Sequence, residues 1–168
     1  MPLIAADHVI RLSGGATNAV GNASLGGIKS STVAPQTLEA LFDVVSSAEA
    51  LAGDTEYRCV YLHNGNASSQ MEPAKVWISA NTPLAGTTIE IGVGTSAVNA
   101  TEQTVVDENT APTGVTFVAA ANEAAAVALG NIPFGQHRAV WIKRITTAGA
   151  GFSSNDTWQL TFKSDFSA

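Results

Sequence analysis

The chain has 168 residues, of which 45% are hydrophobic and only 13% are charged, and its formal net charge is −6. This length is typical of a single domain, and the charged fraction is about half that of ordinary globular proteins. The few Lys and Arg residues are scattered, so they lack the clustering that binding to nucleic acid phosphates requires. We expect no nucleic acid partner, whereas the acidic balance is compatible with a basic protein surface.

The sequence also argues against a membrane or disulfide-bonded protein. No apolar run approaches the roughly 20 residues of a membrane-spanning helix, and residues 1–8 lack the basic start and apolar stretch of a signal peptide. Cys59 is the single cysteine, so it has no partner within the chain, and its alternating surroundings indicate a small buried side chain. We expect no membrane partner and assembly in a reducing cytoplasm.

Residues 1–35 differ from the rest of the chain. Residues 9–12 predict one short strand, and residues 13–27 are rich in Gly and Asn without periodicity, which indicates a loop. So long a structureless stretch is uncommon inside a compact domain. We expect residues 1–35 to form an extended arm ordered by neighbouring molecules, and residues 36–168 to form the folded domain.

Residues 37–51 carry a helical pattern between Pro35 and Gly53, two residues that commonly flank helices. We expect a short helix near 37–51 that packs against the sheets. Its apolar residues follow the i, i+3, i+4, i+7 spacing of an amphipathic helix: Leu38, Leu41, Phe42 and Val45.

From Asp54 onward, short alternating runs predict β-strands separated by turns, which is typical of an all-β antiparallel sandwich. Residues 123–129 are Ala-rich and stay open between helix and strand, Asn64-Gly65 predicts a tight turn, and residues 99–114 predict a long exposed loop. The predicted strands span residues 57–63, 74–80, 87–93, 115–119, 138–145 and 157–166. The side chains that we expect inside the sandwich are Val60, Leu62, Val76, Ile78, Ile89, Ile91, Val140, Ile142, Leu160 and Phe162.

A search for catalytic chemistry finds no assembled motif. The three histidines, His8, His63 and His137, do not stand at metal-ligand spacing, and the chain has neither a Gly-x-Ser-x-Gly elbow nor a phosphate-binding loop. Asp54 and Glu56 share a strand face, but their place at a polar strand start indicates a solvated entrance. We therefore expect no enzymatic activity, no cofactor and no metal.

Two binding alternatives stay open. Residues 107–109 could bind calcium, although they lack the spaced carboxylates of an EF-hand. Trp77, Trp141 and Trp158 could stack on a sugar, although Trp residues centred in strands are more often core. An exposed, coplanar pair of these rings would favour a carbohydrate-binding module, and burial would eliminate it.

Two sets of motifs resemble known families. Residues 60–65, 75–79, 129–135 and 140–143 resemble the immunoglobulin-like modules of bacterial surface and phage proteins. In those modules a strand ending in Asn-Gly, a second strand and a Leu…Pro-x-Gly corner recur. The resemblance covers about half of the chain and implies an immunoglobulin-like antiparallel β-sandwich.

The second resemblance is to small virion structural proteins of tailed bacteriophages, and it spans nearly the whole chain through residues 10–18, 23–27, 41–49, 53–59 and 140–144. It implies a non-enzymatic virion protein, assembled in the host cytoplasm, whose partners are the major capsid protein or another virion protein and copies of itself. We expect capsid decoration or cementing at the head exterior; a tail, baseplate or fibre component and a carbohydrate-binding module are the alternatives. The candidate assembly contacts are Leu12, Leu25, Ile28, Arg138, Lys143 and Arg144.

Overall fold

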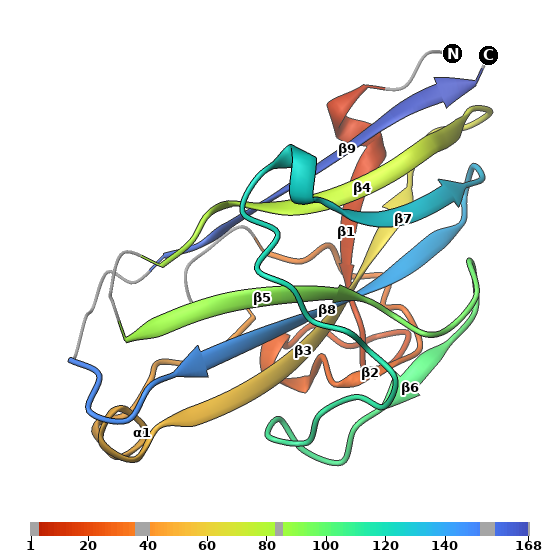
Figure 1. The fold of residues 1–168 in the computed structure, drawn as a ribbon. Helices are drawn as coiled ribbons and strands as arrows, with labels where there is room; N and C mark the ends of the chain where they lie inside the picture. Colours follow the sequence, from red (N-terminus) through yellow and green to blue (C-terminus); the bar gives the residue numbers. More distant parts are fainter. Residues whose placement is uncertain (1–3, 36–40, 83–85, 152–156, 168) are drawn as a thin grey trace.

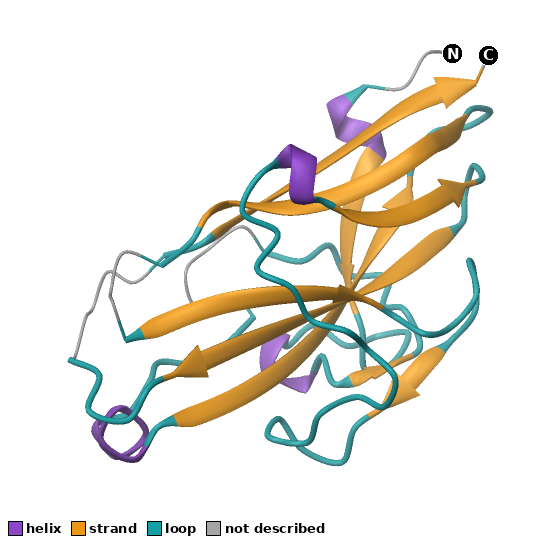
Figure 2. Ribbon diagram, in the orientation of Figure 1, coloured by secondary structure: helices purple, strands orange, loops and turns teal. Residues whose placement is uncertain are grey.

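A computed structural model describes residues 4–35, 41–82, 86–151 and 157–167. This part of the chain is mostly β, as Figure 2 shows. Its helical elements are η1 (Ala5–Asp7), η2 (Gly21–Ala23), α1 (Ser47–Ala52) and η3 (Glu123–Ala125). Its strands are β1 (His8–Leu12), β2 (Gly26–Gly27), β3 (Asp54–Asn64), β4 (Gln70–Ala80), β5 (Thr87–Val93), β6 (Glu102–Thr104), β7 (Val127–Ile132), β8 (His137–Thr146) and β9 (Gln159–Ser167).

The strands form two main antiparallel sheets and one small one (Figure 1). The four-stranded sheet has the order β1-β3-β8-β5, and the three-stranded sheet has the order β7-β4-β9. The longest pairing joins β3 to β8, from Asp54 opposite Thr146 to His63 opposite His137. The short strands β2 and β6 pair with each other.

The two main sheets share one hydrophobic core, and the alternation of the sequence predicted half of its buried residues. Eight of the ten side chains expected inside are at most 2% exposed, whereas Leu160 and Phe162 of β9 are half-buried against the same core. Burying one such aliphatic side chain stabilises the fold by about 1.5–3 kcal/mol. This core therefore supplies the main stabilisation that holds the two sheets together.

The outer face of the four-stranded sheet is also buried. A second apolar cluster contains Tyr61 and Trp141, and residues 13–30 and 94–118, here called the covering layer, lie over it. The layer is hydrogen-bonded to β3, because the Cys59 amide donates to the Ser24 carbonyl over 2.7 Å and the Ser13 hydroxyl donates to the Cys59 carbonyl over 2.7 Å. Cys59 is wholly buried, as expected, and β2 and β6 lie in this layer, to the lower right in Figure 1.

Within residues 1–35, the described residues 4–35 make strand pairing and hydrogen bonds with the rest of the chain, and their ordering by neighbouring molecules stays a prediction. Strand β1 pairs with β3, and Leu12 is wholly buried. Residues 30–34 then return along the other edge of β1, where the Ala34 amide donates to the Ile10 carbonyl over 2.8 Å. The sequence did not predict this packing, because backbone hydrogen bonds and small side chains produce no periodic pattern of hydrophobic residues.

The helix expected near 37–51 is wrong in its extent. Residues 36–40 lie outside the described part, residues 41–46 are not helical, and α1 begins at Ser47. The Ser46 hydroxyl accepts from the Glu49 amide over 3.2 Å, and the Glu49 carboxylate accepts from the Ser46 amide over 2.6 Å, which is a capping box. Leu41 and Phe42 are buried because they close the end of the core, so their spacing signalled burial and not a helix.

Three further local expectations are corrected. The tight turn expected at Asn64-Gly65 is absent, since neither residue has a positive φ. The chain crosses here from one sheet to the other, because β3 and β4 belong to different sheets. The buried Asn64 side chain donates to the carbonyls of Ser69 and Ile132. Residues 115–119 form only an isolated bridge, between Ile91 and Val118. Residues 99–114 include β6 within the covering layer, so this stretch is only partly an exposed loop.

Candidate functional site

The densest group of charged side chains lies at the end of the core beside α1, which we call the helix end. Alternation along β3 points Glu56 and Arg58 to the same inner face as Val60, and Arg144 stands opposite Glu56 on β8. Asp43 comes from the segment before α1, and Glu108 comes from the connection after β6. We call these five residues the charge cluster.

Arg58 holds the centre of the charge cluster and is wholly buried. Its Nε donates to the Leu41 carbonyl over 3.1 Å, and its Nη1 donates to the Tyr57 carbonyl over 3.2 Å. Its Nη2 lies 3.6 Å from Glu56 and 3.9 Å from Asp43, and it also pairs with Glu108. One guanidinium therefore connects two separate segments, residues 41–43 and the connection after β6, to β3.

Arg144 on β8 makes a second set of contacts within the charge cluster. Its guanidinium pairs with Glu56, donates to the Asp43 carbonyl over 2.6 Å and lies 3.4 Å from the Asp43 carboxylate. The Phe42 ring packs against both guanidinium groups, with ring centroid distances of 5.1 Å for Arg58 and 4.8 Å for Arg144. Such contacts add cation–π attraction where the groups are removed from water.

Burial raises the pKa of Glu56 to about 7, while the positive charges of Arg144 and Arg58 act to lower it. The ligand oxygens of Asp43, Glu56 and Glu108 lie within 4.8 Å of one another, which is a donor set that hard cations use. Here the Arg58 guanidinium faces all three carboxylates. The ion pairs of the charge cluster therefore hold segments of the same chain together.

The expectation of a solvated strand entrance is wrong for Glu56, which is 2% exposed. Asp54 is half-buried and accepts a hydrogen bond from the Asn109 side chain over 2.8 Å. The alternation that predicted Val60 and Leu62 inside extends to Arg58 and Glu56. The signal for their inward orientation was therefore present in the sequence, although their partners were not identifiable from it.

The second feature is an open groove of about 670 Å³ between β1 and β9. It is lined by Ile10 from β1, by Trp158 and Phe162 from the β9 side, and by Leu41. At its end the His8 Nε2 lies 2.9 Å from the Ser164 hydroxyl. Apolar and polar atoms both line the groove, and His8 is the one ionisable side chain among its described lining residues.

The six candidate assembly contacts do not form one surface. Leu12 is wholly buried and Arg144 is 8% exposed inside the charge cluster, so their side chains are used within the chain. Their expected role as contacts is revised for this reason. Among the others, Lys143 pairs with Glu90 over 2.9 Å, Arg138 donates to the Ser96 carbonyl, Leu25 packs in the second cluster and Ile28 is 55% exposed.

The tryptophans are also separated. Trp141 is wholly buried, so it cannot stack on a sugar. Trp77 is half-buried on β4, and Trp158 makes an edge contact with Phe42 at a centroid distance of 6.1 Å. Within the described residues, no two tryptophan rings contact each other.

Among the residues that the structure describes, no helix is long and apolar enough to cross a membrane. Comparison of the chain with protein-family models, with curated proteins and with solved structures found no match.

Proposed function

We propose that this protein is a non-enzymatic structural protein of a tailed-phage virion that decorates and stabilises the exterior of the capsid. The observation that supports the proposal is that the buried charged side chains are engaged in contacts within the chain. Glu56, Arg58 and Arg144 bind one another and nearby backbone, and the described residues that line the open groove include one ionisable side chain, His8. These internal contacts suit a rigid protein. The proposed protein acts by binding the major capsid protein or another virion protein.

The surface supports the same proposal. Large apolar side chains are exposed at several places, among them Ile28, Leu51 and Val106, which are 55%, 76% and 83% exposed. The whole chain has a low charged fraction. Protein interfaces combine apolar side chains with a polar, hydrogen-bonding rim, so this composition suits assembly with other subunits and with further copies of the same chain.

We place the folded unit among immunoglobulin-like sandwiches by the number of strands in its two antiparallel sheets. Sheets of four and three antiparallel strands correspond to the numbers of the constant-type immunoglobulin fold. The strand order is different: in that fold the second strand pairs with the fifth, whereas β3, the second of the seven sandwich strands, pairs with β8, the sixth. The proposed likeness is therefore one of architecture and not of connectivity.

A capsid cement stabilises the assembled shell by mass action, because it binds the shell and not the free capsid subunits. The test is to purify particles of the encoding phage and to locate the protein by cryo-electron microscopy and antibody labelling. We expect regular occupancy over the head, and heads that lack the protein should open at lower temperature. Labelling restricted to the tail, baseplate or fibres would replace the proposal with its alternative, and absence from purified particles would refute both.

A further inference from the structure

The helix end presents an acidic surface that is also apolar. Val44 and Val106 are 55% and 83% exposed, and each is close in sequence to a carboxylate of the charge cluster. The two segments meet, because the carboxylates of Asp43 and Glu108 belong to a group whose oxygens lie within 4.8 Å of one another. Asp107, between Val106 and Glu108, is exposed. We call these five residues the acidic apolar surface.

A surface of opposite charge lies on the N-terminal segment. Ile28 and Val33 are 55% and 50% exposed; Ile28 precedes Lys29, and Val33 stands opposite Arg11 in an isolated bridge. The positive charge of Arg11 and, more strongly, burial lower the pKa of Lys29, so the two cations are near each other. We call these four residues the basic apolar surface.

The two cations of this surface have no acidic partner in the described part of the chain. Five of the other basic residues pair with carboxylates, whereas no described carboxylate lies within ion-pair distance of Arg11 or Lys29. The Arg11 guanidinium donates instead to the Ser31 carbonyl. Two cations without a carboxylate partner, beside exposed apolar side chains, are a surface that an acidic, partly apolar partner would complement.

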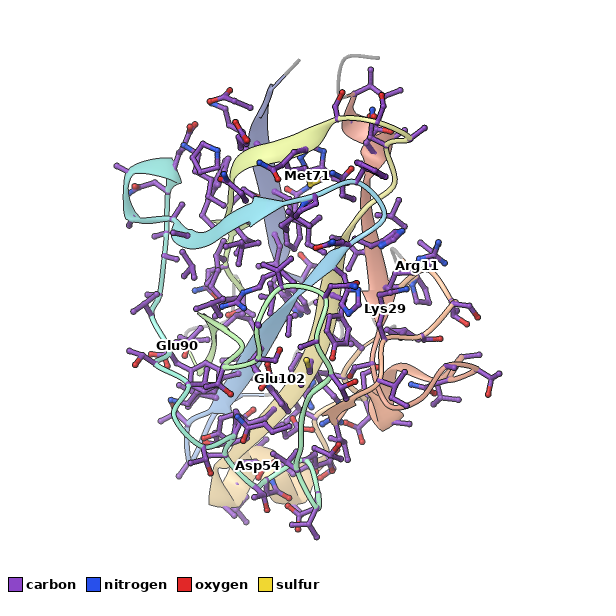
Figure 3. The ribbon with its side chains drawn as sticks, turned by 90° about the vertical axis from the view of Figure 1, so that its right-hand side faces the viewer. Arg11, Lys29, Asp54, Met71, Glu90 and Glu102 are labelled. Atoms are coloured by element: carbon purple, nitrogen blue, oxygen red, sulfur yellow. The ribbon has the colours of Figure 1, made fainter. Side chains whose placement is uncertain are left out.

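We propose that the acidic apolar surface of one copy docks on the basic apolar surface of a second copy. The apolar residues of the two surfaces would contact each other while the exposed Asp107 approaches Lys29 and Arg11. Figure 3 shows Arg11 and Lys29 on one side of the molecule and Asp54, at the helix end, at its bottom. Because the surfaces are different and separate, the contact is head-to-tail and repeats into a ring or a filament. The proposal holds whether or not the protein belongs to a virion.

The test is sedimentation velocity of the purified chain over a concentration series that reaches hundreds of micromolar. We expect species larger than a dimer that grow with concentration and weaken as salt rises, because salt screens exposed charges. A chain that stays monomeric, or that stops at a dimer, would overturn the head-to-tail contact.

Two single variants and their combination test the docking partners. Lys29→Glu and Asp107→Lys each oppose like charges, so each should weaken association at least tenfold. The double variant restores an opposite-charge pair and should recover most of it. Lys163→Glu and Asp165→Lys make the same charge changes on β9 and should leave association unchanged. Far-ultraviolet circular dichroism and thermal midpoints verify folding; folded single variants that associate normally, or a double variant that fails to recover, would refute the proposed pairing.

Discussion

Replacing Arg58 by Met is the sharpest test of the charge cluster. Met retains part of the apolar stem but removes hydrogen bonds to the carbonyls of Leu41 and Tyr57, each worth about 1 kcal/mol net. It also leaves Glu56, which is 2% exposed, with one cation fewer. Removing one partner of a buried ion pair costs about 3–5 kcal/mol, and we expect Arg58→Met to lower the free energy of unfolding by that amount. A domain is stable by only about 5–15 kcal/mol, so the variant should lose a large part of its stability.

Urea unfolding followed by tryptophan fluorescence and circular dichroism measures this loss. The matched control is Lys163→Met, because Lys163 pairs with Glu123 over 2.8 Å on an exposed face, where such a pair contributes less than about 1 kcal/mol. Adding Glu56→Gln to Arg58→Met should recover part of the loss, since it neutralises a buried carboxylate that has kept Arg144 but lost Arg58 as a cationic partner. An Arg58→Met variant within about 1 kcal/mol of wild type, or no recovery in the double variant, would show that the buried charges are not coupled as described.

Burial lowers the pKa of His137 to about 4, below the unfolded value near 6.5, so its contribution to stability should be lost as pH falls from 6.5 towards 4. His137→Gln should flatten the fall in the urea midpoint over that range. The pH dependence from Glu56 runs in the opposite direction, because its pKa is raised to about 7. Its contribution to stability is therefore lost as pH rises from about 4.5 to 7. Glu56→Gln should make the fall in the urea midpoint on acidification steeper. Ser46→Ala removes the helix cap and should lower the free energy of unfolding by about 1 kcal/mol; unchanged urea midpoints would contradict this. Gly26→Ala should cost more than about 1 kcal/mol, because φ is +90° and the added Cβ would lie 1.9 Å from the carbonyl oxygen of Gln103 in β6. Gly149→Ala, with similar φ and open space around it, is its control and should cost less in a parallel thermal melt.

Alternation was sufficient to predict the inner faces of β3, β4, β5 and β8, because a strand with one face towards a core repeats every two residues. It could not predict which strands pair. Consecutive strands β3 and β4 lie in different sheets, and the Asn64-Gly65 signal favoured a hairpin that the chain does not make. Local turn preference was overridden here by the packing of two sheets.

The charge cluster was missed for a different reason. Glu56 meets Arg144, which is 88 residues away, and no local pattern reports such a contact. The helix expectation failed because buried Leu41 and Phe42 mimic a helical stripe, whereas Ser46 and Glu49 carried the true start signal. A capping-box search would have found α1, but the partners of Glu56 required the fold itself.

The two cores on either side of the four-stranded sheet have a consequence for mutational tolerance. Residues from Glu56 to Leu62 on β3 are buried without interruption, whereas β4 alternates between buried and half-exposed positions from Ala74 to Ile78. In a library that samples every substitution, β4 should tolerate polar residues at every second position. The centre of β3 should tolerate them nowhere, so its sequence is constrained at each residue even though its composition includes charged and aromatic side chains.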